Sequence, residues 1–365
     1  MGITRESVLD ALRTVEDPDL KQDLVSLNMI QDLKVSEGNI NFTVVLTTPA
    51  CPLKEVIKNA CLEAINQLVS SNVKTTINMT SNVTSIRGKD APLLPEVKNI
   101  IAVSSGKGGV GKSTVSVNLA VSLAKAGAKV GLIDADIFGP SIPTMFNCTN
   151  EQPGIIKKGD KNLIVPIEQY GVKLLSIGFL TPADNAVIWR GPMASSALKQ
   201  FIGDTEWGSL DYLIVDLPPG TSDIHLTLVQ SVPVTGAIIV TTPQKVALAD
   251  ASKGLAMFKQ PNINVPVLGI VENMAYFIPP DYPDNKYFIF GEDGGKKFAE
   301  QHQIPLLAQI PLEEPVRISG DNGYPVAMED GSAGTAFRAL AENLAREIAI
   351  RNAQIPQTKK VEMNT

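Results

Sequence analysis

The chain has 365 residues, of which 44% are hydrophobic and 19% are charged, and its formal net charge is −6. These values exclude a largely disordered chain and allow two domains with cores that need no cross-links. The negative charge argues against non-specific nucleic-acid binding, which depends on a basic surface.

Targeting segments are not evident in the sequence. The first twenty residues alternate apolar and charged side chains, whereas a signal peptide has a continuous apolar core. The longest apolar runs have the length of strands and fall short of the ~18 residues of a membrane helix. Three cysteines without a close pair favour a reducing compartment over a disulfide scaffold. We therefore expect a cytoplasmic protein without a membrane or nucleic-acid partner.

Residues 1–87 predict a small α+β domain. Apolar side chains at helical spacing predict helices over 4–15 and 53–70, and further apolar runs predict strands at 30–35, 40–47 and 74–86. The stretch 88–98, GKDAPLLPEVK, has prolines and a glycine between periodic segments, and we expect it to be a linker.

From residue 99 to 354 the pattern changes to alternating strands and helices. Several apolar runs are continuous, as in strands buried on both faces, and helical stretches separate most of them. This order predicts an α/β domain with a mostly parallel sheet and helices on both faces. The runs lie at 100–104, 130–135, 172–178, 212–217, 237–242 and 265–273, a last helix is expected over 333–352, and 355–365 is expected to be a flexible tail.

A phosphate-binding loop follows the first of these strands. Residues 106–113, GKGGVGKS, fit the pattern G-x-x-x-x-G-K-S/T between a buried strand and a helix, which is a strong signal for an NTPase. The glycines let successive backbone N–H groups turn toward an anion, and the helix N-terminus adds partial positive charge. We expect Lys112 to bind the β- and γ-phosphates of ATP and Ser113 to bind Mg²⁺. The expected nucleotide-binding residues of the loop are Gly106, Lys107, Gly108, Gly109, Val110, Gly111, Lys112, Ser113 and Thr114.

Carboxylates stand at the ends of two other predicted strands. Asp216 ends the run YLIVDL, and Asp134 lies at the end of VGLIDA, with Asp136 two residues further on. In a parallel sheet these strand ends face the ligand crevice. A single Asp at such a position is more often an ordinary turn or cap residue, but two strand-end carboxylates beside a phosphate loop favour a functional role. We therefore expect Asp216 to support Mg²⁺ beside Ser113.

A second lysine in the loop, Lys107, needs a separate explanation. Lys112 already meets the phosphates, and a second cation held at the same place would be repelled by it. A long ammonium at this position is able to reach the nucleotide of another subunit and to stabilise charge on the transferred phosphoryl group. A solvated surface lysine is the alternative that the spacing leaves open.

The stretch KGGVGKST resembles the deviant phosphate loop of the ATPase superclass that contains MinD, ParA and the nitrogenase iron protein. The resemblance implies a sandwich dimer in which Lys107 contacts the partner's nucleotide. It also implies that Asp136 positions the attacking water and that Asn273, in GIVENM, reads adenine. The catalytic residues expected from motif and resemblance together are Lys107, Lys112, Asp136 and Asp216.

Within that superclass the chain resembles the Mrp/ApbC family of iron–sulfur cluster carrier ATPases over nearly its whole length. Matching stretches include DADIFGPSIP, WRGPM at 189–193, DLPPGTSDIHLTL at 216–228 and IPLEEPVRISGDNGYP at 310–325. EDPDLKQDLVSLNMI and LTTPACPLKEVI resemble the small cluster-assembly domain that commonly precedes this ATPase. The resemblance implies a homodimer that passes a 4Fe–4S cluster to apoprotein clients, with slow ATP hydrolysis as a conformational switch.

The chain departs from that family where most members have a C-P-x-C pair after ENMAYF. Residues 278–295 contain no cysteine, as in the plastid branch of the family. Cys51, in TTPACPL, matches the characteristic cysteine of the small domain and is the best candidate for a cluster ligand, with packing at a helix start as the alternative. The remaining thiols and imidazoles are expected in structural roles: Cys61 in a buried helix, Cys148 in a loop without a motif, and His225 and His302 as hydrogen-bonded or surface side chains.

Two other functions remain open. One is a positioning ATPase like MinD or ParA, which predicts a basic amphipathic C-terminal helix or a basic surface stripe. The last helix instead carries charges of both signs opposite its apolar stripe, which favours packing in the core. The stripe consists of Phe337, Leu340, Leu344 and Ile348. The other function is a scaffold that keeps ATPase-gated protein contacts but no longer binds a cluster.

Overall fold

The computed structural model of the chain describes residues 3–36, 38–87, 93–137, 139–180, 191–279, 281–282 and 284–361. Residues 88–92 of the predicted linker, the first two residues of WRGPM and residues 362–365 lie outside this part. The chain divides into two compact units, Met1–Thr84 with Ala345–Ile355, and Ser85–Leu344 with Pro356–Thr365.

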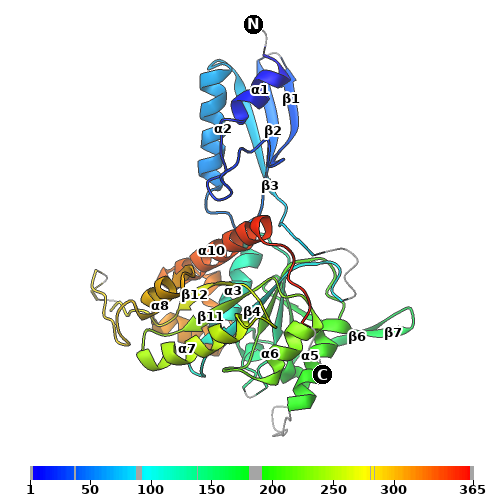
Figure 1. Ribbon diagram of the computed structural model, residues 1–365, viewed down its shortest axis with the longest axis vertical. Helices are drawn as coiled ribbons and strands as arrows, with labels where there is room; N and C mark the ends of the chain where they lie inside the picture. Colours follow the sequence, from blue (N-terminus) through cyan, green and yellow to red (C-terminus); the bar gives the residue numbers. More distant parts are fainter. Residues whose placement is uncertain are drawn as a thin grey trace. The chain divides into compact units, whose positions relative to one another are not determined.

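The first unit contains a three-stranded sheet in the order β1-β2-β3 (Figure 1). β1 pairs antiparallel with β2, and β3 pairs parallel with β2 after the crossover helix α2. The elements are α1 (Arg5–Leu12), β1 (Ile30–Ser36), β2 (Asn39–Leu46), α2 (Lys54–Leu68) and β3 (Lys74–Ser81). All five predicted elements are present, but β3 ends before residue 86 because its partner β2 ends at Leu46, which pairs with Ser81.

The second unit is built on an eight-stranded sheet in the order β13-β12-β11-β4-β10-β5-β9-β8, in which only the edge strand β8 is antiparallel. The strands are β4 (Val97–Ser105), β5 (Val130–Asp134), β8 (Ile167–Gln169), β9 (Val172–Ser176), β10 (Leu210–Asp216), β11 (Gly236–Thr241), β12 (Val267–Glu272) and β13 (Leu306–Gln309). The helices are α3 (Lys112–Lys125), α4 (Ile142–Met145), α5 (Gly191–Gly203), α6 (Asp223–Ser231), α7 (Lys245–Phe258), α8 (Gly294–His302), α9 (Glu314–Asn322) and the part of α10 (Ser332–Gln354) that precedes Ala345. The predicted α/β class is confirmed.

The strand order decides which helices cover which face of this sheet. β4 leads through α3 toward β5, whereas β10, β11 and β12 lead through α6, α7 and α8 toward the opposite edge. Because crossovers between parallel strands are right-handed, α3 lies on one face and α6, α7 and α8 lie on the other. The direction of travel reverses at β4, and such a reversal marks the ligand crevice at the carboxyl ends of the strands.

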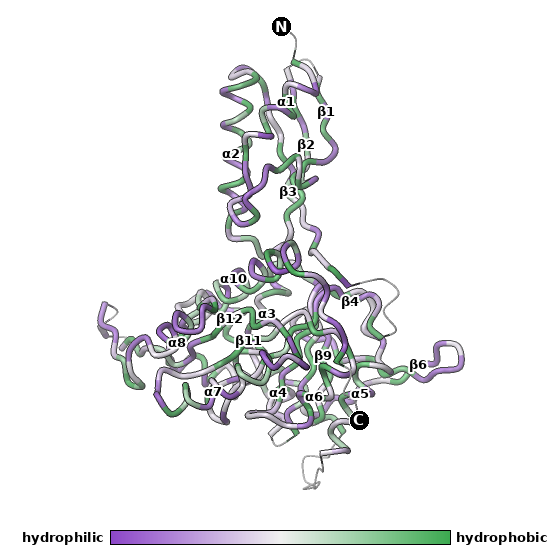
Figure 2. The backbone as a smooth tube through the Cα atoms, in the orientation of Figure 1, coloured by the Kyte–Doolittle hydropathy of each residue, from purple (hydrophilic) through white to green (hydrophobic). Residues whose placement is uncertain are grey.

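The central strands are buried along their length because helices cover both faces. All residues of β5 and β11 are buried, and Figure 2 shows the tube as mainly apolar through this sheet. Continuous burial explains why continuous apolar runs, rather than alternating ones, were the signal for these strands.

The apolar runs miss three features of the second unit. One is the hairpin of β6 (Gly154–Lys158) and β7 (Lys161–Val165), in which every residue of β6 is exposed. The others are the short strands β8 and β13, with three and four residues. Within the expected flexible tail, Val361 is 7% exposed and donates its N–H to the Val229 carbonyl. The expectation is wrong at this residue because its apolar side chain packs in the main core.

Candidate nucleotide site

The phosphate loop joins β4 to α3 at the carboxyl edge of the sheet, as predicted. Gly109 and Gly111 have φ of +81° and +79°, in the left-handed region that favours glycine. Gly106 has a different role, since a Cβ there would lie 2.1 Å from the backbone carbonyl carbon of Asp250 in α7. The loop therefore runs directly against α7, and a side chain at residue 106 would prevent that approach.

The loop lines a cavity of about 200 Å³. Residues 107–114 all line it, so the structure brings every predicted loop residue except Gly106 to one open space. Four residues that the sequence reasoning missed also line the cavity, namely Ser105, Ser141, Met145 and Pro219. Ser141 and Met145 belong to the region of the short helix α4, which carries no phosphate-site motif of its own.

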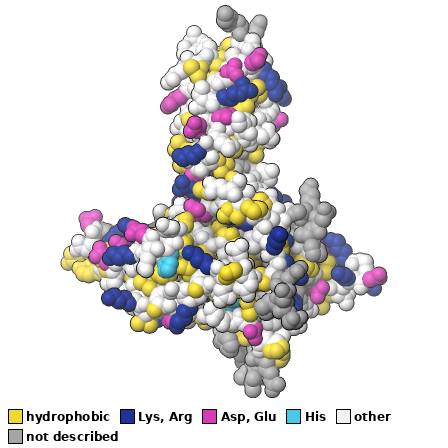
Figure 3. Space-filling view, viewed as in Figure 1, with side chains coloured by type: hydrophobic (Ala, Val, Ile, Leu, Met, Phe, Trp, Pro, Cys, Tyr) yellow, Lys and Arg dark blue, Asp and Glu magenta, His cyan; other side chains and the backbone are white. Residues whose placement is uncertain are grey.

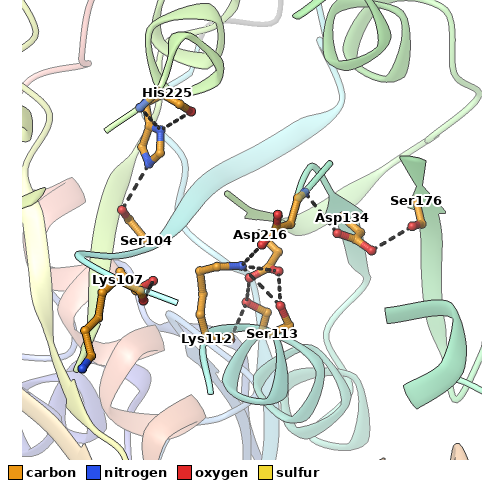
Figure 4. A network of polar contacts seen from close by, with 12 residues as sticks. Ser104, Lys107, Lys112, Ser113, Asp134, Ser176, Asp216 and His225 are labelled. Carbon is orange, nitrogen blue, oxygen red and sulfur yellow. Dashed lines mark hydrogen bonds and ion pairs between the residues drawn. The ribbon is translucent and has the colours of Figure 1, made fainter. Parts of the chain in front are cut away.

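Lys112 is buried, with 6% of its side chain exposed, and carboxylates surround its ammonium (Figure 4). Its Nζ lies 2.7 Å from Oδ2 of Asp216 and 3.5 Å from Oδ2 of Asp136. Burial by itself lowers the pKa of this ammonium, but the carboxylates outweigh burial, and the Lys112 pKa is raised above its ordinary value. The lysine is therefore charged at neutral pH.

Asp216 also accepts hydrogen bonds from two serines of α3. Ser113 Oγ donates to Oδ2 at 2.7 Å, and Ser116 Oγ donates to Oδ1 at 2.6 Å. Ser116 was not predicted, although its position three residues after Ser113 puts both hydroxyls on one helix face. A hydroxyl beside a carboxylate supplies the oxygen ligands that Mg²⁺ prefers. Together with the buried Lys112 ammonium and the glycine-lined loop, this donor set fits a magnesium nucleotide.

Asp134 and Asp136 contribute in different ways. Asp136 lines the cavity, whereas Asp134 is fully buried at the end of β5. Asp134 accepts hydrogen bonds from Ser176 Oγ at 2.8 Å and from the backbone N–H of Asp136 at 3.2 Å. Burial, followed by the neighbouring Asp216 carboxylate, raises the pKa of Asp134 to about 7. Asp134 thus holds the backbone of Asp136, and Ser176 holds Asp134.

Lys107 extends away from Lys112 (Figure 4). Its backbone carbonyl accepts a hydrogen bond from Ser105 Oγ at 3.0 Å. Within the described part of the chain, the Lys107 ammonium itself has no hydrogen-bond or ion-pair partner. The role of this ammonium across a dimer stays a prediction.

Asn273 is hydrogen-bonded to the backbone of the phosphate loop. It is 6% exposed, and its Nδ2 donates to the Val110 carbonyl at 2.8 Å. A Cβ on Gly111 would lie 2.2 Å from this nitrogen, which gives a second reason for glycine at that position. The preceding residue, Glu272, is buried and accepts from the backbone N–H of Gly295 at 2.6 Å. The end of β12 therefore contacts both the phosphate loop and the start of α8, and adenine recognition by Asn273 stays a prediction.

The three cysteines form no disulfide and differ in exposure. Cys61 is buried in the first unit, as expected, and burial raises its pKa to about 12. Cys148 is buried as well, its thiol donates to the Pro143 carbonyl at 3.5 Å, and burial followed by Glu151 raises its pKa to about 12. Iron is bound by thiolates, so both groups are poorly suited as cluster ligands. Cys51 is half-buried just before α2.

The two histidines have structural partners. His225 is 1% exposed and hydrogen-bonded through both ring nitrogens, and the ring of His302 lies 4.5 Å from that of Phe298 between centroids. Over the described ranges of the chain, no group of three or more His, Cys, Asp or Glu side chains is arranged to hold a metal ion.

The last helix contributes to the core. Its four stripe residues are each at most 1% exposed, as packing in the core predicts. The members of the stripe are Phe337, Leu340, Leu344 and Ile348.

None of the helices in the described residues is both long enough and apolar enough to cross a membrane. On the face shown in Figure 3, basic and acidic side chains are interspersed.

Two family models match the chain. Residues 96–348 match the family described as NUBPL iron-transfer P-loop NTPase. Residues 5–77 match the family described as iron-sulfur cluster assembly protein.

Similar proteins span nearly the full chain. An "Iron-sulfur cluster carrier protein" of Synechocystis sp. is 48% identical over 95% of this chain and 99% of its own length. The chloroplastic "Fe-S cluster assembly factor HCF101" of Oryza sativa is 42% identical over 96% of this chain and 65% of its own length. Among solved structures, a nucleotide-binding protein of Archaeoglobus fulgidus in complex with ADP is 38% identical, with a TM-score of 0.57 over 65% of this chain and 91% of that one.

Proposed function

This chain belongs to the NUBPL iron-transfer P-loop NTPase family, and we propose that it is an ATP-hydrolysing carrier that passes iron–sulfur clusters to apoproteins. One observation carries the proposal: a phosphate site with a buried Lys112–Asp216 pair shares its chain with a cluster-assembly domain over residues 5–77. The carrier names of relatives that align over nearly the whole chain support it. The motif-based resemblance to the cluster carrier ATPases is thereby confirmed.

Lys112, Ser113 and Asp216 are the groups proposed to hold MgATP. The Lys112 ammonium would bind phosphate oxygens, while the Ser113 hydroxyl and the Asp216 carboxylate, which are hydrogen-bonded to each other at 2.7 Å, would hold the metal. Bound Mg²⁺ neutralises charge on the phosphates. Asp136 is proposed to orient water, because its carboxylate lines the cavity and its backbone is held by Asp134. We propose slow hydrolysis that serves to switch conformation rather than to sustain turnover.

A homodimer completes the proposed mechanism. The Lys107 ammonium points away from its own site, and at the partner's nucleotide it would stabilise charge on the transferred phosphoryl group. Asn273 is proposed to read adenine with the amide group that also holds the Val110 carbonyl. We assign this chemistry to residues 99–354, after a small domain at 1–87 and a linker at 88–98, and we place the protein in the cytoplasm without a membrane or nucleic-acid partner.

The cluster, proposed to be of the 4Fe–4S type, is the cargo of this cycle. Residues 278–295 contain no cysteine, and Cys61 and Cys148 are buried with raised pKa values. Cys51 is therefore the proposed ligand. Two copies of the chain would then supply two Cys51 thiolates to a labile cluster at their interface.

Anaerobic reconstitution with iron and sulfide tests the proposal. The wild-type protein is expected to take up a cluster, seen by absorption and Mössbauer spectroscopy, and to activate an apoprotein that requires one. Transfer is expected to respond to MgATP in the wild type but not in Lys112→Ala, which serves as the control for the nucleotide site. If the wild type takes up no cluster under conditions in which a C-P-x-C relative does, the carrier function is wrong.

A scaffold without a cluster is the second candidate, favoured by the missing cysteines in 278–295. It predicts MgATP-dependent binding of the client apoprotein with no iron in the purified or reconstituted chain. The reconstitution experiment therefore separates the two functions. A positioning ATPase is not favoured, because the apolar stripe of α10 is buried.

A further inference from the structure

His225 connects the helix that follows Asp216 to the strand that precedes the phosphate loop (Figure 4). The backbone N–H of Ser222 donates to Nδ1 at 3.2 Å, and Nε2 lies 3.3 Å from Oγ of Ser104. Burial lowers the pKa of His225 to about 4, so the ring is neutral at physiological pH. Since Nδ1 accepts from a backbone N–H, the single ring proton is on Nε2, which donates to Ser104.

Ser104 lies at the end of β4, two residues before Gly106. It is fully buried, and within the described residues its hydroxyl has His225 as its only partner. The next residue, Ser105, accepts the backbone N–H of Gly220 at 2.8 Å and donates its hydroxyl to the Lys107 carbonyl at 3.0 Å. The last two residues of β4 thus hold both the start of the phosphate loop and the segment after Asp216.

The segment 217–222 is consequently fixed at several points. Asp216 anchors its beginning through Lys112, and the N–H of Leu217 donates to the Val103 carbonyl at 3.0 Å. Gly220, with φ of +79°, gives the segment its turn. At the far end, Ser222 has no bond of its own to β4 in the described part of the chain, and the His225 ring connects it to that strand. Pro219 of the same segment lines the nucleotide cavity.

We propose that His225 is a positioning residue for ATP hydrolysis, whose Nε2–H bond to Ser104 keeps the segment 217–222 against the phosphate loop. The inference rests on the proposed ATPase activity but not on cluster transfer. Without this bond, the segment and Gly220 occupy a wider range of positions, and the fraction of molecules with a correctly assembled site falls. Nucleotide affinity changes little, because the bonds of Lys112 and Ser113 to Asp216 do not involve His225.

Two amide substitutions separate the contacts of the ring. The side-chain amide of His225→Gln reaches the place of Nε2 and keeps a donor for Ser104. That of His225→Asn reaches the place of Nδ1 and keeps only the contact with Ser222. Ser104→Ala removes the acceptor without changing the helix, so it should reproduce the Asn variant. Thr227→Val is the matched control, because Thr227 is a buried residue of α6 whose hydroxyl bonds, among the described residues, only to Asp223 and Ser195, away from β4.

The readouts are kcat for ATP, the Kd of MgADP, and hydrogen–deuterium exchange of the Leu217 and Gly220 amides. His225→Asn and Ser104→Ala should each lower kcat roughly five- to tenfold, the range for one ordinary hydrogen bond, with Kd within twofold. Their combination should add nothing further, and both should speed exchange at Gly220. His225→Gln and Thr227→Val should stay within twofold of the wild type.

The inference is overturned if His225→Asn keeps full kcat, if His225→Gln is impaired as strongly, or if the Thr227→Val control loses as much. A wild type that hydrolyses no ATP would refute the proposed function instead. The exchange measurement still decides the positioning role in that case, since it needs no turnover: unchanged exchange at Gly220 in His225→Asn overturns it.

Discussion

Replacing Gly106 by alanine should damage the phosphate loop through its contact with α7. The added Cβ would lie 2.1 Å from the Asp250 carbonyl carbon and 2.4 Å from the Ala251 nitrogen, whereas ordinary contact begins at 3.4 Å. The two backbones must therefore separate by about 1.3 Å, and overpacking of this kind costs about 1–3 kcal/mol. That cost corresponds to a fall in Tm of roughly 2–10 °C.

A loop displaced by that amount also misplaces the N–H groups that point at phosphate. Losing one hydrogen bond to a charged group weakens binding by about 1.5–3 kcal/mol, so the Kd of MgADP should rise at least tenfold. Calorimetric titration with MgADP and a thermal melt measure both effects without hydrolysis. Gly254→Ala is the control, because it lies in the same helix and its Cβ would meet nothing within 4 Å. If Gly106→Ala binds and melts like Gly254→Ala, the steric argument is wrong.

Three further outcomes are expected. Lys107→Ala should bind MgATP with wild-type Kd in calorimetry yet lose ATPase activity, and normal turnover in this variant would contradict a role across a dimer. Cys51→Ser should lose the reconstituted cluster absorbance, whereas Cys148→Ser, which changes a buried thiol, should keep it; equal retention by both would remove Cys51 as a ligand. The pKa of His225 is lowered from 6.5 in the unfolded chain to about 4 in the folded protein, so between these pH values the unfolded chain binds a proton that the folded protein does not. The free energy of unfolding should therefore fall, by up to about 3 kcal/mol, as the pH is lowered from 6.5 to 4. Denaturant unfolding at pH 7 and pH 4.5 should show a smaller loss for His225→Gln than for the wild type, and parallel losses would refute the shift.

The residues nearest the phosphates were predictable because local sequence determines them. A glycine-rich turn between a buried strand and a helix places Lys112 and Ser113 without reference to the rest of the chain. Asp216 was predictable as well, because it ends a strand whose continuous apolar run is easy to detect. A continuous apolar run likewise predicts Asp134 at the end of a strand, but it does not predict that the Asp134 carboxylate is turned away from the cavity toward Ser176.

Contacts between distant parts of the chain were not predictable from one sequence. The approach of Gly106 to Asp250 and the bond between Ser104 and His225 join residues more than a hundred positions apart. No sequence pattern marks Ser104 or Ser176 as part of the site, because a serine in a buried strand fits any position that offers a hydrogen-bond partner. The strand β13 was not predicted for another reason, because a run of four residues is too short to show periodicity.

The ion pairs of Lys112 have a consequence for how the nucleotide enters. The ammonium already pairs with two carboxylates, so a phosphate oxygen that binds it competes with Asp216 and Asp136 rather than meeting an unpaired charge. A bare triphosphate would leave the released acids facing new negative charge at short range, where the repulsion is weakly screened. A divalent ion arriving with the nucleotide removes that repulsion, because the acids change partner from ammonium to metal. We therefore expect loading of the site to be an exchange of counterions that favours the magnesium complex over free ATP.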